Sequence, residues 1–146
     1  IAVAANGENQ IIVAPGANAA FMPQWLVLPQ TPATICQLEI PLQTVARVAA
    51  EVRGFFCVNL APAMTVPGDI LRRADLLVVN DGEAAFYGAA LHAGAGLVAV
   101  THGARGATLW QAGRRIADAM PPAAWQKSIN DPILEIESVG ARIENR

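Results

Sequence analysis

Short apolar runs alternate with segments of helical periodicity through the middle of this chain. The apolar runs predict four strands, at residues 34–39, 55–60, 76–79 and 97–100. The apolar positions of two other segments recur at helical spacing and predict helices, at residues 42–52 and 82–93. Strands that alternate with helices predict an α/β fold with a mostly parallel sheet, flanking helices and right-handed crossovers.

Hairpins are predicted on either side of this region. The first would pair residues 1–5 with residues 10–14 across an Asn-Gly turn. The second would pair residues 108–112 with residues 115–118 around Gly113. The proline-containing stretch after the first hairpin predicts irregular structure. Beyond the second hairpin no convincing strand or helix pattern remains.

The composition is typical of one packed domain. The 146 residues are 53% hydrophobic and only 15% charged, which favours a buried core and excludes disorder. Residues 55–60 are almost wholly apolar, so we expect helices on both faces of the sheet. The net charge is −2 and basic residues never cluster beyond a pair, so neither nucleic acid nor a membrane surface is an expected partner. Residues 84–104 carry no formal charge, but their glycines favour a helix and a buried strand over a membrane span.

The cysteines and the first residue bear on location. Cys36 and Cys57 each lie in a strand-like run, which favours two reduced, buried thiols over a disulfide and predicts a cytoplasmic protein. The chain begins at Ile1, inside a predicted strand, and no signal-peptide pattern follows. We therefore expect the sequence to be a fragment.

Asn80 and Glu83 directly follow one of the predicted strands. They are one helical turn apart and can face the same space at the carboxyl end of the strand, where open α/β sheets bind ligands. A carboxylate there could hold Mg²⁺ through water, since Mg²⁺ takes few carboxylates and keeps its waters. The same pair also matches a helix capping box, which needs no ligand. Both interpretations stay open on these residues alone.

A glycine-containing loop at residues 101–106 follows the next predicted strand. Gly103 and Gly106 would leave backbone N–H groups accessible to a phosphate, and a simple turn between strands is the alternative. His102 has no evident nucleophile or carboxylate partner and is interpreted as a solvated bystander. His92, on an alanine-rich helix, is interpreted as structural or exposed. Together the two loops suit a nucleotide phosphate and its metal ion, which points to phosphoryl transfer.

Several other polar or aromatic residues carry weaker signals. Glu39 ends a predicted strand, where its carboxylate could accept hydrogen bonds from sugar hydroxyls, although a surface position is the favoured interpretation. Asn59 is equally ambiguous. Trp25, Trp110 and Trp125 are too scattered to form a stacking platform and are expected to pack. No Gly-x-Gly-x-x-Gly joins a strand to a helix, which excludes a dinucleotide-dependent oxidoreductase.

Six short motifs follow one another along the chain. They are Asn6-Gly7-Glu8-Asn9, Pro15-Gly16-Ala17-Asn18, Gln37-Leu38-Glu39 with Pro41-Leu42, Asn59 with Ala61-Pro62-Ala63, Asn80-x-x-Glu83 and Thr101-x-Gly103-x-Arg105-Gly106. In this order they resemble the ribokinase branch of the ribokinase/PfkB carbohydrate-kinase family. The resemblance covers residues 1–118, implies a partial, truncated ribokinase-like fold and leaves residues 119–146 as an unmatched tail.

The resemblance implies an ATP-dependent sugar kinase, which transfers the γ-phosphoryl group of ATP to a hydroxyl of a ribose-like sugar. ATP and Mg²⁺ would be the cofactors. The residues that would line the ATP site are Asn80, Thr101, Gly103, Ala104, Arg105 and Gly106. Glu83 would help to organise Mg²⁺, and Glu39 would contact the sugar.

The chain departs from the family pattern at its catalytic segment. The family's Gly-Ala-Gly-Asp, which supplies the catalytic Asp, should follow Asp118, but only Ser138-Val139-Gly140-Ala141-Arg142 occurs there. No catalytic residue is therefore assigned. The family's amino-terminal sugar loops are absent as well, and the connections at residues 22–32 and 84–97 are shorter than the family's.

These departures predict an incomplete kinase that is inactive as this polypeptide. It should self-associate through the surface that the missing parts would cover. The alternative is a non-catalytic α/β module that binds a nucleotide or a partner.

Overall fold

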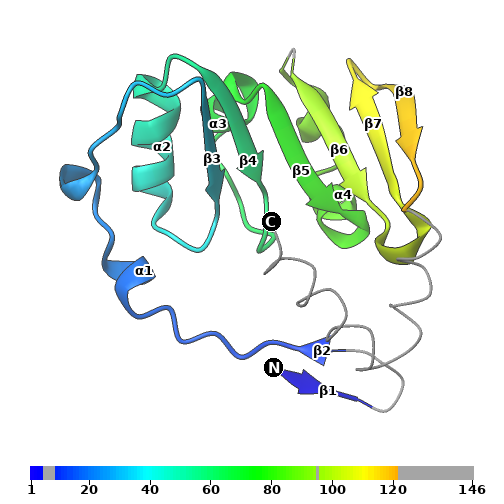
Figure 1. Cartoon of the computed structure of the whole chain (residues 1–146), viewed down its shortest axis with the longest axis horizontal. Coiled ribbons are helices and arrows are strands. Elements are labelled where there is room, and N and C mark those ends of the chain that lie inside the picture. The colour runs from blue at the N-terminus through cyan, green and yellow to red at the C-terminus, as the bar shows by residue number, and fades with distance from the viewer. Residues whose placement is uncertain (5–8, 95, 122–146) are drawn as a thin grey trace, which may run out of the picture.

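The computed structural model describes residues 1–4, 9–94 and 96–121 (Figure 1). Its main feature is a six-stranded sheet with the strand order β3-β4-β5-β6-β7-β8. The strands are β3 (Ala33–Gln37), β4 (Phe55–Asn59), β5 (Leu76–Asn80), β6 (Leu97–Thr101), β7 (Ala107–Gln111) and β8 (Arg114–Ala119). β3, β4, β5 and β6 pair in parallel. β7 pairs antiparallel with β6 on one side and with β8 on the other. The predicted mostly parallel α/β sheet is confirmed.

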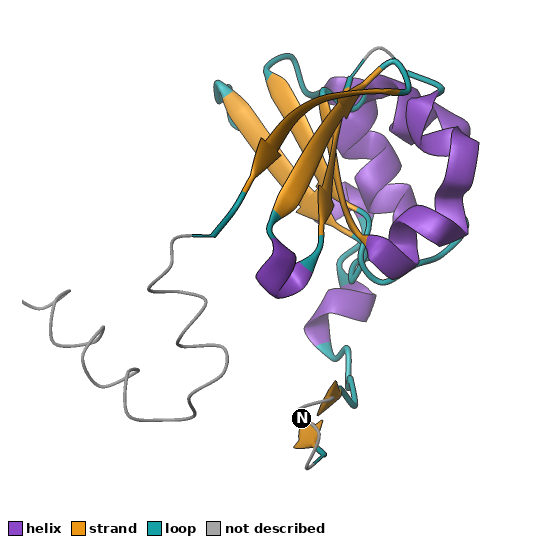
Figure 2. Cartoon of the chain, turned by 90° about the vertical axis from the view of Figure 1, so that its right-hand side faces the viewer, coloured by secondary structure: helices purple, strands orange, loops and turns teal. Residues whose placement is uncertain are grey.

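Three helices connect the parallel strands and lie on one face of the sheet (Figure 2). They are α2 (Leu42–Glu51), α3 (Gly68–Arg73) and α4 (Asp81–Tyr87). The sequence analysis predicts α2 correctly but no helix where α3 lies. α3 has only six residues, too few to display an amphipathic period, although Asp69 in its first turn and two arginines in its last turn suit a helix dipole.

The helix predicted at residues 82–93 is two elements. α4 ends at Tyr87, and the 3₁₀ helix η2 (Gly88–His92) continues the chain. Gly88 has a φ of +52°, a left-handed conformation that glycine adopts without steric cost and that ends the regular helix. The connection from β5 to β6 thereby stays short while Leu91 is buried against the core.

The core lies between the helices and the sheet face they cover. Alternate strand residues point into it, because side chains of a strand alternate between the two faces. The largest fully buried side chains include Phe56, Val58, Val79 and Val98 from the strands, and Val45 and Ile70 from the helices. Thr44, also fully inaccessible, donates its hydroxyl to the Phe21 carbonyl at 2.7 Å.

No described helix covers the opposite face of the sheet (Figure 2). Exposed apolar side chains lie on this face. Ile35 is 76% exposed and Phe55 is 44% exposed. The expectation of helices on both faces is therefore wrong for the residues that the structure describes. The strand order advances in one direction from β3 to β6, and right-handed crossovers in one direction place all their helices on the same side.

The amino-terminal segment runs past the carboxyl ends of the parallel strands (Figure 1). β1 (Ala2–Val3) and β2 (Asn9–Gln10) pair antiparallel, so a hairpin is present but shorter than predicted. The predicted Asn-Gly turn lies outside the described residues. A short helix, α1 (Ala17–Ala20), and the 3₁₀ helix η1 (Pro23–Trp25) follow. Irregular structure is predicted for residues 22–32, which is confirmed for residues 26–32 and wrong for the residues of η1.

The second hairpin is confirmed. β7 and β8 are joined by Ala112 and Gly113, which have φ values of +48° and +73°. Two consecutive positive φ values are those of the tight turn that matches the twist of antiparallel strands. Residues 122–146, which make up nearly all of the predicted tail, lie outside the described residues, so the division at residue 118 stays a prediction.

The two cysteines are both free. Cys36 pairs with Val58 and Cys57 with Ile35 in neighbouring strands, so the two side chains point to opposite faces of the sheet. Burial raises the pKa of both thiols above the ordinary value. The prediction of unpaired thiols is confirmed.

The described part of the chain holds no helix with the length and apolar character of a membrane span. Its longest helix, α2, has ten residues.

Candidate functional site

Asn80 and Thr101 are register partners at the carboxyl ends of β5 and β6. α4 begins at Asp81 directly after β5, so the polar segment at residues 80–83 forms the first helical turn and not the loop that the sequence suggests. The loop after β6 begins beside this turn. Two strands away, β3 ends at Gln37, which pairs with Asn59 at the end of β4. Glu39 follows Gln37, so all the predicted site residues lie along one edge of the sheet. The edge shared by residues 80–83 and 101–106 agrees with the sequence prediction, whereas the place of Glu39 on it was not predicted. The chemical roles of all these residues stay predictions.

Asn80 and Glu83 form a complete capping box at the start of α4. The Glu83 backbone N–H donates to Asn80 Oδ1 at 2.8 Å, and the Asn80 backbone N–H donates to Glu83 Oε2 at 2.8 Å. The Glu83 side chain is nearly inaccessible, with 8% of the residue exposed. Of the two interpretations left open by the sequence, the cap is the one that the geometry displays.

Tyr87 lies one turn further along α4. Its hydroxyl donates to the Met64 carbonyl at 2.7 Å and ties the helix to the loop after β4. Burial raises the pKa of Tyr87, the hydrogen bond with Met64 opposes that rise, and the Glu83 carboxylate adds to it. The capping box thus fixes the start of α4, and Tyr87 fixes its end.

The loop after β6 forms a 3₁₀ turn, η3 (Gly103–Arg105). Its backbone is partly satisfied internally, because the N–H groups of Arg105 and Gly106 donate to the carbonyls of His102 and Gly103. Among the described residues, no backbone acceptor faces the N–H groups of Gly103 and Ala104. These two exposed groups are what the loop offers to an anion.

Gly106 is needed for the close contact of this loop with the end of β8 rather than for the approach of a ligand. It has a φ of +94°, and a Cβ at this position would lie 2.1 Å from the Ala119 carbonyl oxygen. At Gly103, whose φ is +57°, a Cβ would meet no atom within 4 Å. Of the two glycines, Gly103 is therefore the one with open space beside it.

Asp81, the first residue of α4, connects this helix to the loop after β6. His102 Nδ1 lies 2.6 Å from Asp81 Oδ1, and an Arg105 guanidinium N–H donates to Asp81 Oδ2 at 2.8 Å. An ionised carboxylate only accepts, so Nδ1 carries the proton. The interpretation of His102 as a solvated bystander is wrong, because this histidine has a carboxylate partner and is only partly exposed.

The hydrogen bonds continue from His102 into β7. With the proton on Nδ1, Nε2 of the neutral ring accepts from the Thr108 hydroxyl at 3.1 Å. Thr108 Oγ1 in turn accepts from Trp110 Nε1 at 2.9 Å. Neither Asp81 nor Thr108 is predicted as a site residue. The signal for Asp81 was its place directly after a strand, since the ends of parallel strands meet at one edge of a sheet. No sequence signal points to Thr108, which lies within β7.

The residues present do not fit a directly ligated metal ion. Within the described ranges, no three His, Cys, Asp or Glu side chains come together in a way that could hold one. One oxygen of Glu83 is used in the capping box, and both oxygens of Asp81 are bonded to His102 and Arg105. The role of Glu83 toward Mg²⁺ therefore stays a prediction.

A cavity of about 510 Å³ lies at the same sheet edge, beside Glu39. It is lined by Ile11, Val13, Pro15, Asn18, Leu38, Glu39, Ala61 and Pro62. The amino-terminal segment thus forms one wall, and the loops after β3 and β4 form the other. An exposed carboxylate and an amide beside an apolar wall are groups that can hold a polyol, since carboxylates accept from hydroxyls.

No family model matches the chain. Its structure is similar to that of the ribokinase from Thermotoga maritima, with a TM-score of 0.69 and 25% identity over 83% of this chain and 47% of that one. Ribokinase from Cryptococcus neoformans in complex with ADP gives 0.64 and 23%, covering 82% and 48%. Ribokinase from Arabidopsis thaliana complexed with ribose and ATP gives 0.57 and 21%, covering 81% and 46%.

These likenesses define the class of fold. The chain has a ribokinase-like α/β fold, and the resemblance to ribokinases and related sugar kinases is confirmed in structure. The chain spans about half the length of the ribokinases it matches.

Proposed function

We propose that this chain carries the nucleotide-binding edge of an ATP-dependent sugar kinase of the ribokinase type. One observation carries the proposal. Asn80 and Thr101 end neighbouring parallel strands, and Asp81 in the first turn of α4 bonds to His102 and Arg105 of the loop after β6. Phosphoryl transfer depends mainly on positioning and on the neutralisation of phosphate charge, so a pre-ordered helix start and loop at a sheet edge suit it.

The phosphates would lie against the loop after β6. Arg105 is 76% exposed in its side chain and uses one N–H group on Asp81, which leaves further donors of its fork for a phosphate oxygen. The N–H groups of Gly103 and Ala104 would add neutral donors. Thr101, Gly106 and Asn80 would shape the site, since their polar groups already take part in local hydrogen bonds or close packing.

A ribose-like sugar is the proposed acceptor, and the cavity beside Glu39 is its proposed place. The cavity and the loop after β6 lie on the same edge of one sheet, which is where an acceptor hydroxyl would have to meet the nucleotide. Glu39 and Asn18 supply acceptors and donors for sugar hydroxyls. The bonds between Asp81 and the loop after β6 support the proposed phosphate site more directly than the proposed sugar site.

Mg²⁺ would be bound mainly by the phosphates and water, with Glu83 reaching it only through water. We assign no catalytic base and derive no step through the metal. The two free thiols favour a reducing compartment, and we propose the cytoplasm.

Activity of the 146-residue polypeptide is tested by an ADP-release assay with ribose and Mg·ATP. We expect no turnover on the ordinary kinase scale of about 1–100 s⁻¹, because loss of a general base alone typically costs about 10²–10⁴-fold. Turnover in that range would show that the chain holds a base that we have not recognised.

A loop graft tests the site itself. Residues 80–83 and 101–106 would replace the matching loops of the Thermotoga maritima ribokinase, with Gly103→Val in the same graft as the matched control. We expect the graft to retain ATP-dependent ribose phosphorylation and the control to lose at least tenfold in kcat/KM, because a side chain at Gly103 obstructs the phosphate. A folded graft without activity would contradict the proposed function.

A further inference from the structure

Asp81, His102 and Arg105 form a cluster at the start of the loop after β6, which we call the Asp81 cluster. The Asp81 carboxylate accepts from His102 Nδ1–H at 2.6 Å and from the Arg105 guanidinium at 2.8 Å. The His102 side chain is only 20% exposed, whereas the other two are more than half exposed. The inner histidine and the outer arginine thus share one carboxylate, so a change at Arg105 alters the charge that His102 faces.

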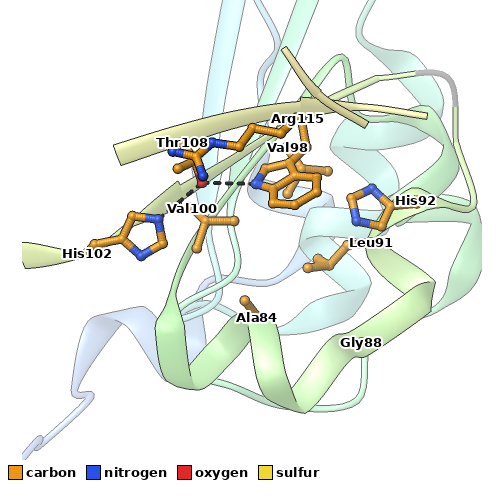
Figure 3. Close-up of a pocket in the computed structure, with 10 residues that line it drawn as sticks. Ala84, Gly88, Leu91, His92, Val98, Val100, His102, Thr108 and Arg115 are labelled. Atoms are coloured by element: carbon orange, nitrogen blue, oxygen red, sulfur yellow. Dashed lines mark hydrogen bonds between the residues drawn. The ribbon is translucent and has the colours of Figure 1, made fainter. Parts of the chain in front are cut away.

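The inner side of the His102 ring is hydrogen-bonded as a neutral imidazole. Trp110 Nε1–H donates to Thr108 Oγ1 at 2.9 Å, and the Thr108 hydroxyl donates to His102 Nε2 at 3.1 Å, which Figure 3 shows as dashed lines. A protonated ring would donate from Nε2 instead, and the Thr108 oxygen has two lone pairs with which to accept from both rings. Proton uptake by His102 therefore requires only that the Thr108 hydroxyl turn its proton toward another acceptor.

Other titratable groups on the elements around His102 are engaged or lie further off. Arg115 of β8 lines the same cavity of about 310 Å³ as His102, and its guanidinium is paired with Asp118. The Glu83 carboxylate takes part in the capping box of α4. His92 of η2 lies at the opposite end of the cavity from His102 (Figure 3). The Asp81 cluster itself therefore supplies the charges that bear most directly on the His102 ring.

We propose that an oxyanion bound at Arg105 is taken up together with a proton, which His102 accepts. The inference rests on the proposed function, because it concerns the same phosphate site. A bound oxyanion adds negative charge beside the Asp81 cluster and shares the Arg105 guanidinium with Asp81. Both changes favour the protonated imidazolium, since a nearby opposite charge favours the charged form of a group.

The coupling gives the phosphate site a pH dependence of definite sign. Histidine is the side chain whose charge ordinarily changes between about pH 5 and 8. Coupling between two binding events is reciprocal, so protonation of His102 must strengthen oxyanion binding as much as the oxyanion favours protonation. The site should therefore bind oxyanions more tightly as the pH falls through this range.

The probe is sulfate, whose own charge stays constant over this range, so any pH dependence of its binding belongs to the protein. Sulfate is titrated into the full chain at about pH 6 and about pH 8, at constant ionic strength, and followed by the amide shifts of Gly103 and Ala104 in NMR. We expect saturable shifts, with binding about threefold or more tighter at the lower pH. His102→Asn keeps an N–H donor for Asp81 but takes up no proton, and it should bind sulfate equally at both pH values.

The ring signals of the histidines give a second readout that needs no variant, so misfolding of His102→Asn cannot hide the result. The chain has only two histidines, and His92 serves as the internal control. Sulfate added at about pH 7 should move the ring signals of His102 toward the protonated form and leave those of His92 unchanged.

The outcomes separate this inference from the proposed function. Equal sulfate affinity at the two pH values, an unresponsive His102 ring, or the same pH dependence in His102→Asn would each overturn the proton coupling and leave the phosphate site standing. Absence of saturable shifts at Gly103 and Ala104 at both pH values would overturn the coupling and the proposed phosphate site together.

Discussion

Asp81 holds His102 with one carboxylate oxygen and Arg105 with the other. Asp81 and Arg105 are well exposed, and exposed ion pairs typically contribute about 0.2–1 kcal/mol. The contribution of Asp81 is therefore chiefly geometric, because it sets the position of the loop after β6 relative to the start of α4. Arg105→Ala should accordingly leave the free energy of unfolding within about 1 kcal/mol of the original.

The two glycines of the loop after β6 should respond differently to substitution. Gly106→Ala places a Cβ 2.1 Å from the Ala119 carbonyl oxygen at a positive φ, so β7 and β8 must shift to accommodate it. We expect a loss of more than about 2 kcal/mol of stability, in line with the large costs of overpacking and backbone strain.

Gly103→Ala is the matched control, because its Cβ would meet open space and only the positive φ opposes it, at about 1–2 kcal/mol. Urea denaturation of both variants measures the difference. If Gly106→Ala were as stable as Gly103→Ala, the close approach of residue 106 to the Ala119 carbonyl oxygen would be contradicted.

Residue types alone predict that the carboxyl ends of β5 and β6 lie side by side, but they do not predict the hydrogen bonds between the residues that follow. Asn80 and Thr101 are predictable because each follows an apolar run, and the ends of parallel strands meet. The pairing of Asp81 with His102 spans 21 residues of sequence and depends on the exact register of β5 on β6, which composition and periodicity do not specify. A histidine such as His102, which has no hydrogen-bond partner nearby in the sequence, is therefore interpreted as solvated even when the fold brings a distant partner to it.

At the scale of elements, α4 depends on its cap. The helix has only seven residues, and an isolated helix of that length is unstable in water, so the first turn needs its side-chain partners. Asn80→Ala removes the acceptor for the Glu83 N–H and should cost about 1 kcal/mol.

Asn80→Asp keeps an acceptor at the same position and serves as the control, which should lose much less. Chemical denaturation with far-ultraviolet circular dichroism compares the two. If Asn80→Ala and Asn80→Asp were equally stable, the capping box would not support α4.

The strands are predictable as elements because each is an apolar run with a clear polar or glycine boundary. α3 is not, because its helical residues are few, and Pro67 directly before it and Gly68 at its first position are typical of a loop. The break at Gly88 is also missed, since a glycine within a helical pattern does not by itself show a positive φ. Short elements are stabilised here by packing, which local sequence does not record.

At the scale of the molecule, the open sheet face and the edge strand β3 should drive self-association. Ile35 lies on the open face and in β3, and its side chain is largely exposed. Among the described elements, no strand pairs with the outer edge of β3. Exposed edges and apolar faces pair with other chains, and a net charge of −2 gives little repulsion.

We expect a mass above that of the monomer at micromolar concentrations in sedimentation velocity. Ile35→Lys should shift the distribution toward monomer, because a lysine on an edge strand opposes pairing. Gln37→Lys, on the same strand and face, adds the same charge without removing an apolar side chain and should shift it less. A chain that is monomeric at every concentration would show that the open face does not associate.

We propose above that the first turn of α4 and the loop after β6 act as one phosphate site. The most direct measurement is an amide NMR titration of the full chain with Mg·ATP, and the same titration of Asp81→Ala. We expect weak, saturable shifts at both Glu83 and the Gly103–Ala104 peptide groups, competed by pyrophosphate and diminished together in Asp81→Ala. Shifts in only one of the two segments, or in neither while the chain stays folded, would contradict it.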